Sequence, residues 1–185
     1  MDVDIVLDFL DNLGDSKNLP LEVLSKKLVA LIALTSAHRA QTISLIKVIN
    51  IRKNSRGLEI HIPDLIKTSA PGKAQPVIFL PTCDLRPNLC LVSCLNTYLE
   101  VTSPYRKGED RLILANKIPF KPVSSQTISK WIKSILGEAG IDTQVFSGHS
   151  TRHAATSSAF NRGVDLETIK NTAGWSNRSK VFLSL

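Results

Sequence analysis

Hydrophobic residues recur at helical spacing along two stretches in the first quarter of the chain. The first stretch predicts a helix opened by Ser16 or Asn18, and a second helix is expected over residues 37–47 with Ile43 and Ile46 inward. Each stripe is wide enough to bury one face of its helix against a core. The inward positions of the first helix are Leu24, Leu28, Leu31 and Ile32.

A β section follows, because three short segments are apolar or alternate apolar and polar residues with a period of two. Prolines bracket the third segment, which suits a strand at the edge of a sheet. Turn-forming residues at 54–57 and 69–73 connect the segments. We therefore expect a small three-stranded antiparallel sheet with two tight links. The three segments are residues 49–51, 58–62 and 76–81.

Helical spacing returns in the second half of the chain, on both sides of a loop-rich segment at residues 102–123. The clearest helix has a cap at Ser124 or Ser125 and a left-handed terminator at Gly140. The expected inward residues are Leu91, Leu95 and Tyr98 or Leu99 in the helix after Pro87, and Ile128, Trp131, Ile132, Ile135, Leu136 and Ala139 in the helix after the loop.

The end of the chain has the pattern of a helix, a turn and a second helix from Ser147 onward. Gly163 ends the first of these helices, and Asp165 caps the second, which runs to Ala173. The chain contains no internal repeat and no low-complexity tract. Together these patterns predict an α+β fold, a mainly helical single domain over residues 1–185 with a small three-stranded antiparallel sheet.

Composition narrows the class of protein. Apolar residues make up 43% and charged residues 21%, as in an ordinary soluble globular domain, and no apolar run is long enough to span a membrane. The acidic start fits neither a secretory signal nor a transit peptide. Cys83, Cys90 and Cys94 lack the His or acidic neighbours of a zinc site, which indicates reduced core thiols. We expect a nuclear or cytoplasmic protein that is not secreted.

The charge is positive and unevenly distributed. The net charge is +7, yet the first 20 residues carry five aspartates against one lysine, so the positive excess lies in the rest of the chain. Such an excess suits a polyanionic partner such as DNA. A solvated basic surface without a partner explains the same charge equally well.

Two cationic residues near the expected start of the penultimate helix suggest an anion site. His149 and Arg152 are three apart in F-S-G-H-S-T-R-H-A-A-T and so share one helix face. Free backbone N–H groups of a first turn point the same way, and a guanidinium binds two phosphate oxygens at once. Taken alone, this spacing is a weak signal.

Other residues add to that candidate site. Arg39 stands between two apolar helices in T-S-A-H-R-A-Q-T, as a capping cation or as a guanidinium directed into a shared pocket. Lys67 and Lys73 flank a turn in I-K-T-S-A-P-G-K, where lysines are commonly only solvated. Trp175 follows Gly174 and is either a core aromatic or a hydrogen-bond donor to the same pocket.

In this order, the residues resemble the catalytic domain of tyrosine recombinases, the phage-integrase-like family. The motif sequences are most similar to those of the branch found in eukaryotic mobile elements, and the resemblance extends from about Val3 to the end of the chain. Five separated motifs in the right order are far more specific than any one of them. They are T-S-A-H-R-A-Q-T, K-T-S-A-P-G-K, K-P-V-S-S-Q-T-I-S-K-W-I-K, H-S-T-R-H-A-A-T-S and A-G-W-S-N-R-S.

The resemblance implies DNA strand breakage and rejoining, with double-stranded DNA as partner and no metal or nucleotide cofactor. Arg39 and Arg152 would hold the scissile phosphate, with His149 and Trp175 adding hydrogen bonds. Lys67 would protonate the leaving 5′-oxygen. A tyrosine would attack the phosphate and form a covalent phosphotyrosine. A homo-oligomer on DNA is compatible with this scheme.

The family pattern is incomplete in this sequence. The nucleophilic tyrosine is expected nine or ten residues beyond Trp175, where Ser184 and Leu185 stand. An acidic residue three after the first arginine is replaced by Thr42. We expect a truncated form of the family's chain, without the N-terminal core-binding domain and without the C-terminal end that carries the tyrosine. We therefore expect a catalytic domain that is inactive alone. The alternative is a domesticated DNA-binding module that retains the phosphate pocket.

DNA contacts outside the pocket are expected at Lys73 and on the polar face of the clearest helix. Gln126, Lys130 and Lys133 lie opposite its apolar stripe, and these residue types can contact bases or phosphates. A plain solvated face is the alternative. A sequence-reading helix–turn–helix over residues 147–174 is less favoured, because acidic residues near the start of its second helix would face DNA phosphates.

Overall fold

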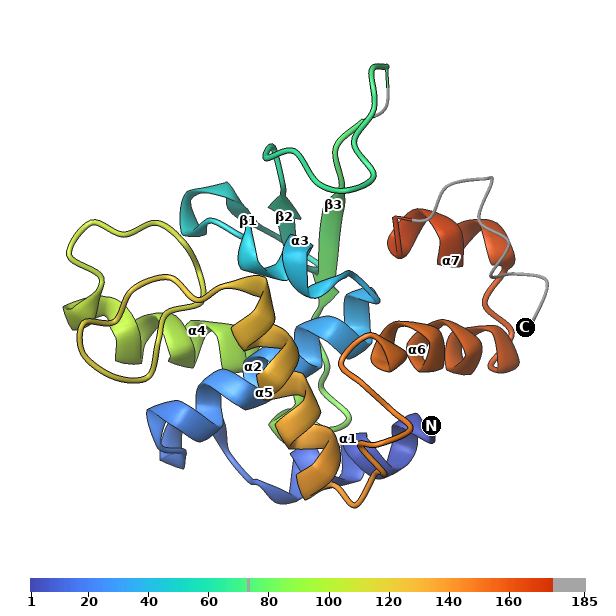
Figure 1. Cartoon of the computed structure of the whole chain (residues 1–185), viewed down its shortest axis with the longest axis horizontal. Coiled ribbons are helices and arrows are strands. Elements are labelled where there is room, and N and C mark those ends of the chain that lie inside the picture. The colour runs from blue at the N-terminus through green and yellow to red at the C-terminus, as the bar shows by residue number, and fades with distance from the viewer. Residues whose placement is uncertain (73, 175–185) are drawn as a thin grey trace.

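Helix α2 (Leu21–Ser36) forms the centre of the fold. The computed structural model describes residues 1–72 and 74–174 (Figure 1). Within them α2 contacts α3, α4, α5, α6 and strand β3, and it is buried on most of its circumference. A helix that is apolar all round is expected to lie inside a protein. The expected inward residues Leu24, Leu28, Leu31 and Ile32 are all buried.

The other helices surround α2. In Figure 1, α5 crosses in front of α2, and α6 and α7 lie together at the right of the domain. Short 3-10 helices link the longer elements. The α-helices are α1 (Val3–Asn12), α3 (Ala40–Ser44), α4 (Leu91–Thr102), α5 (Ser125–Glu138), α6 (Ser150–Asn161) and α7 (Leu166–Thr172), and the 3-10 helices are Ser16–Asn18, Val48–Asn50, Pro87–Leu89 and Ser103–Tyr105.

Three antiparallel strands form the sheet, in the order β1 (Ile51–Asn54), β2 (Gly57–His61) and β3 (Val77–Pro81). Leu58 pairs with Leu80 and Ile60 with Ile78, and these four side chains are buried. The period-two alternation therefore places one face of the sheet on the core. The third strand lies at an edge, as its flanking prolines predict.

The α+β class and the mainly helical character are confirmed, and so are several element ends. Ser124 caps α5 by accepting a hydrogen bond from the N–H of Thr127 at 3.2 Å. Asp165 caps α7 by accepting one from the N–H of Thr168 at 2.9 Å. Both contacts satisfy backbone donors that a helix start leaves unpaired.

Four expectations about element boundaries are wrong. Helix α2 begins at Leu21 with Pro20 as its N-cap, so neither Ser16 nor Asn18, which belong to a 3-10 turn, opens it. The helix expected over residues 37–47 spans only α3, because Ala37 takes a left-handed φ of 50° that ends α2. The first strand begins at Ile51, since Val48–Asn50 is a 3-10 turn. The connection from β2 to β3 is a long segment instead of a tight link. Helix α1 was not expected, although Val6 and Leu10 are buried one turn apart.

The three cysteines are free, and only Cys94 is buried. Cys90 is partly buried and packs against the core, whereas Cys83 is partly exposed and does not, so the prediction of core thiols is wrong for Cys83. No helix within residues 1–72 and 74–174 combines the length and apolar character that crossing a bilayer requires.

Candidate active site

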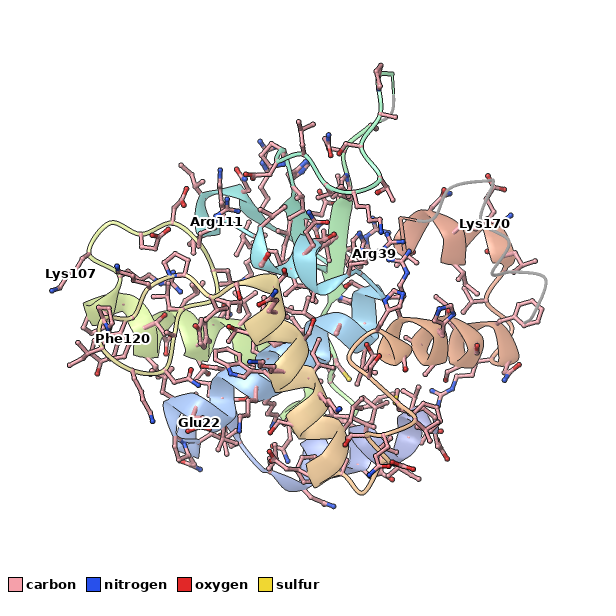
Figure 2. The ribbon with its side chains drawn as sticks, in the orientation of Figure 1. Glu22, Arg39, Lys107, Arg111, Phe120 and Lys170 are labelled. Atoms are coloured by element: carbon pink, nitrogen blue, oxygen red, sulfur yellow. The ribbon has the colours of Figure 1, made fainter. Side chains whose placement is uncertain are left out.

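Arg39 is positioned by the sharp turn between α2 and α3. The Ser36 hydroxyl donates to the carbonyl of Ile32 at 2.7 Å and accepts the N–H of His38 at 3.3 Å, which fixes the chain just after α2. The left-handed Ala37 then reverses its direction. Arg39 follows in an extended conformation as the N-cap of α3. Its side chain lies on the side of the domain that faces α6 and α7 (Figure 2).

Arg152 is positioned by the close packing of the start of α6 against α5. A Cβ on Gly148 would lie 3.0 Å from the carbonyl oxygen of Ser129, so a larger residue would force the two segments apart. The Thr151 hydroxyl donates to the carbonyl of Gly148 at 2.8 Å. The Arg152 side chain is only 3% exposed, and its Nη2 donates to the carbonyl of Ala173 at 2.9 Å. Arg152 therefore connects α6 to the end of α7.

Arg39 and Arg152 line the same pocket, although they are far apart in the sequence. Burial first, and the neighbouring Arg39 cation second, lower the pKa of Arg152 to about 9. The guanidinium stays charged at neutral pH, but it is held in a place that disfavours positive charge. An anion that contacts both arginines would relieve this repulsion. The pocket is lined by His38, Arg39, Thr42, Ile66, Thr68, Ser69, Ala74, Gln75, Pro76, Arg152, Ala173 and Gly174.

His149 and Lys67 extend the cationic cluster around this pocket. His149 is the N-cap of α6, and its ring packs edge-on against His153 with 5.7 Å between the ring centroids. Partial burial lowers the pKa of His149, and the charges of His153, Arg39, Arg152 and Lys67 lower it further. Of the five expected pocket residues, Arg39 and Arg152 line the pocket, whereas His149 and Lys67 lie outside its lining, with His149 close enough for the charges of the other three to act on it.

Lys67 belongs to the connection between β2 and β3, which folds back toward α3. Its backbone N–H donates to Oε1 of Gln41 in α3 at 3.4 Å. The Ser69 hydroxyl accepts the N–H of Ile66 at 2.9 Å and donates to Oε1 of Gln75 at 3.0 Å. These bonds hold the base of the connection beside the pocket, while the Lys67 side chain is exposed.

The remaining expected site residues are not part of this pocket. Trp175 and Lys73 lie outside the described residues. Gln126, Lys130 and Lys133 are exposed on α5, as expected, and none of them lines the pocket. Among the residues that the structure describes, no cluster of three His, Cys, Asp or Glu side chains could hold a metal ion.

Neither of the two tyrosines is placed near the cationic pocket. Tyr98 is fully buried, its hydroxyl accepts the N–H of Leu114 at 2.9 Å, and burial raises its pKa. Tyr105 stacks on Phe120 with 4.3 Å between the ring centroids. Phe120 lies at the opposite side of the domain from Arg39 in Figure 2. Tyr98 and Tyr105 are therefore unsuited to attack a phosphate held by the arginines.

Sequence reasoning missed His38, which lines the pocket beside the two arginines. It is 5% exposed, and its Nδ1 lies 3.0 Å from the carbonyl oxygen of Ser36. Burial lowers its pKa to about 4, the Ser36 hydrogen bond opposes this shift, and the Arg152 and Arg39 charges add to it. Its position next to Arg39 in the sequence was the available signal.

This depressed pKa predicts a loss of stability in acid. The unfolded chain binds a proton at this imidazole below pH 6.5, whereas the folded chain binds it only near pH 4. Stability is therefore fully present above pH 6.5 and falls as the pH drops toward 4, by about 2–3 kcal/mol for this group. Urea unfolding at pH 7 and pH 4.5 measures the change. His38→Gln is expected to lose this part of the pH dependence, and an unchanged dependence would contradict the assignment.

The protein is therefore an α+β domain in which Arg39 and the buried Arg152 line one pocket, between the α2–α3 turn, the β2–β3 connection, α6 and the end of α7. The family model described as the phage integrase family matches residues 6–183, so the chain belongs to that family. No curated protein sequence matches the chain.

Solved structures of recombinases share the fold. XerH site-specific recombinase bound to difH substrate superposes with a TM-score of 0.73 at 15% identity, covering 100% of this chain and 48% of that chain. XerA recombinase gives a TM-score of 0.67 at 15% identity, covering 100% and 57%. The lambda integrase catalytic core gives 0.57 at 15% identity, covering 97% and 93%. The chain thus spans about half the length of the XerH chain.

Proposed function

We propose that residues 1–185 form the catalytic domain of a tyrosine recombinase, which acts in DNA recombination and integration and binds a DNA phosphodiester in the cationic pocket. The observation that carries this proposal is the meeting of Arg39 and Arg152 in one pocket, from segments far apart in the sequence. A buried guanidinium and a partly exposed one that line the same pocket favour an anion that can accept hydrogen bonds from both. A phosphodiester has two non-bridging oxygens for this purpose.

Each cation then has a chemical role that matches its position. Arg39 and Arg152 bind the non-bridging oxygens and stabilise the charge that grows during displacement. His149 adds a hydrogen bond at the start of α6. Lys67 is exposed on a connection anchored beside the pocket, so it can reach a leaving 5′-oxygen and protonate it. The role of Trp175 as an indole N–H donor rests on the motif alone.

Strand cleavage also needs a nucleophile. Tyr98 and Tyr105 are excluded by their burial and position, and the family position holds Ser184 and Leu185 in this sequence. We therefore propose that this chain binds DNA and does not cleave it alone. The same observation favours a second candidate, a domesticated DNA-binding module that keeps the phosphate pocket without the chemistry.

The amino-acid sequences of the motifs support assigning the chain to one branch of the family. The phrases around Arg39 and Arg152 are most similar to the branch of the family from eukaryotic mobile elements, which makes the nucleus the compartment where the chain would meet DNA. The lambda integrase that shares this fold was solved as a dimer bound to a COC′ core site. By analogy, we propose that Gln126, Lys130 and Lys133, together with Lys73, contact DNA and that several copies assemble on it.

Fluorescence anisotropy with duplex DNA tests the binding. Because cations displace counterions from DNA, the logarithm of affinity is expected to fall linearly with the logarithm of salt concentration, with a slope of about −0.9 per phosphate contact. Arg39→Ala should reduce both the affinity and the slope. A salt-independent interaction, or an unchanged one in Arg39→Ala, would contradict the proposal.

A suicide DNA substrate separates the two candidate functions. A recombinase with a usable nucleophile leaves a covalent protein–DNA adduct that survives detergent. We expect no adduct from this chain and an adduct when a tyrosine replaces Ser184 or Leu185, as S184Y or L185Y. DNA binding with no adduct from any of the three chains would favour the non-catalytic module.

A further inference from the structure

His38 has one ring nitrogen committed and the other directed into the cationic pocket. A carbonyl oxygen can only accept a hydrogen bond, so the Nδ1 that lies 3.0 Å from the Ser36 carbonyl must carry the proton. The other nitrogen of the neutral ring, Nε2, is then a bare acceptor. It is buried, has no hydrogen-bond partner among the described residues, and a Cβ on Gly174 would approach it to 3.4 Å.

A buried acceptor without a hydrogen-bond partner lowers the stability of the fold. It is also unexpected in a pocket suited to anions, which need hydrogen-bond donors. A phosphate oxygen is itself an acceptor, so it would be repelled by the lone pair of neutral His38. Protonation at Nε2 converts this repulsion into a charge-assisted hydrogen bond. Burial and the Arg152 and Arg39 charges oppose that protonation.

We propose that His38 is an additional phosphate-binding residue, which takes a proton from solvent onto Nε2 when an anion enters the pocket and donates it to an anion oxygen. This inference rests on the proposed phosphate site. The anion neutralises the field of the two arginines and supplies the acceptor that Nε2–H lacks, so both changes favour the charged ring. One proton moves from solvent to the protein, and the anion is unchanged.

The groups that act on His38 come from each element around it. Arg39 belongs to its own turn and Arg152 to α6, and these are the charges that influence it. The described pocket residues from α3, the β2–β3 connection and the end of α7 are uncharged. His149 and Lys67 border the same cationic cluster, and His149 is a second imidazole whose protonation an anion would favour. A readout specific to each histidine is therefore needed.

Long-range proton–nitrogen NMR of the imidazoles provides that readout. Sodium sulfate is the first probe, because sulfate does not titrate near neutral pH, and duplex DNA is the second. At pH 6.5 the free chain should show His38 protonated at Nδ1 only. Saturation with either probe, at ionic strength matched with sodium chloride, should move the Nε2 shift to that of a protonated ring. His38→Gln identifies the resonance, and His61→Gln, in β2, is the control.

The binding constants give a second test. Because proton uptake is linked to binding, sulfate affinity should rise as pH falls below neutral, by up to about tenfold per unit. His38→Gln keeps a hydrogen-bonding amide but cannot take up the proton. Its sulfate affinity should therefore change less with pH than that of the parent chain, while His61→Gln should match the parent chain. An Nε2 that stays unprotonated in the bound state, or equal slopes in His38→Gln and the parent chain, would overturn the inference.

The two probes distinguish this inference from the proposed function. If DNA binds and depends on Arg152 while His38 stays neutral, the inference fails and the DNA function stands. If sulfate protonates His38 but the chain has no affinity for DNA, the pocket binds anions and the recombinase proposal fails. If neither probe binds, both are wrong.

Discussion

Replacing Arg152 by alanine is expected to weaken binding to duplex DNA by about 10- to 100-fold, because a charge-assisted hydrogen bond contributes about 1.5–3 kcal/mol. The side chain is buried, and among the described residues Arg39 is the only other lysine or arginine that lines the pocket. The fold should persist, since the bond from Nη2 to the Ala173 carbonyl is one contact between α6 and α7. Anisotropy measures the affinity, and circular dichroism checks the fold.

Arg162→Ala is the matched control on the same helix. Arg162 is exposed at the C-terminal end of α6 and pairs with Asp4 at 2.6 Å, away from the pocket. Since exposed ion pairs contribute little, its removal should leave DNA affinity within about threefold of the parent chain. Arg152→Lys keeps the charge but lacks the planar fork, so it should restore only part of the affinity. Equal losses in Arg152→Ala and Arg162→Ala would mean that only net charge matters.

Gly57→Ala is expected to destabilise the domain by about 3 kcal/mol or more, because it combines a strained φ with a direct clash. Gly57 begins β2 with a φ of 154°, and an added Cβ would lie 2.1 Å from the carbonyl oxygen of Leu80 in β3. The two strands would have to separate. Since the β2–β3 connection carries Lys67, DNA affinity should also fall at temperatures where the variant remains folded. Thermal and urea unfolding measure the loss of stability.

Gly137→Ala adds the same methyl group to a different environment. Gly137 lies in α5, and a Cβ there would meet only the Cγ2 atom of Thr143 at 3.3 Å. Because alanine favours helix more than glycine, this variant should be neutral or more stable by up to about 1 kcal/mol. A Gly57→Ala variant as stable as Gly137→Ala would show that β2 and β3 do not pair as described.

The elements that sequence predicts well are those with a complete local signal. Helix α5 has a cap, a long apolar stripe and a terminating glycine, and β3 has flanking prolines. Prediction fails where tertiary contacts decide the conformation. The short α3 depends on the reversal at Ala37, a residue type that rarely adopts a left-handed φ. The sequence does not predict α1, because its two buried residues, Val6 and Leu10, stand among aspartates and are buried only by packing against the rest of the domain.

In the candidate site, too, some residues can be predicted from sequence motifs and others only from tertiary contacts. The order of the motifs predicts Arg39, Lys67, His149 and Arg152 as partners. The structure places Arg39 and Arg152 in one pocket, and His149 within range of the charges of the other three. The sequence contains one hint of His38, its position next to Arg39, but its burial and its Nε2 without a described hydrogen-bond partner depend on tertiary contacts that spacing does not reveal. The role of Arg39 can be inferred from a sequence motif. The role of His38 can be inferred only from the structure, where its Nδ1 is hydrogen-bonded to the Ser36 carbonyl.

A crystal structure of the chain soaked with tungstate, a phosphate mimic with a strong anomalous signal, tests the central claim most directly. We predict one oxyanion bound within hydrogen-bonding distance of both the Arg39 and the Arg152 guanidinium groups. An empty pocket at saturating tungstate, or an anion held by only one of the two arginines while the other points away, would contradict the account.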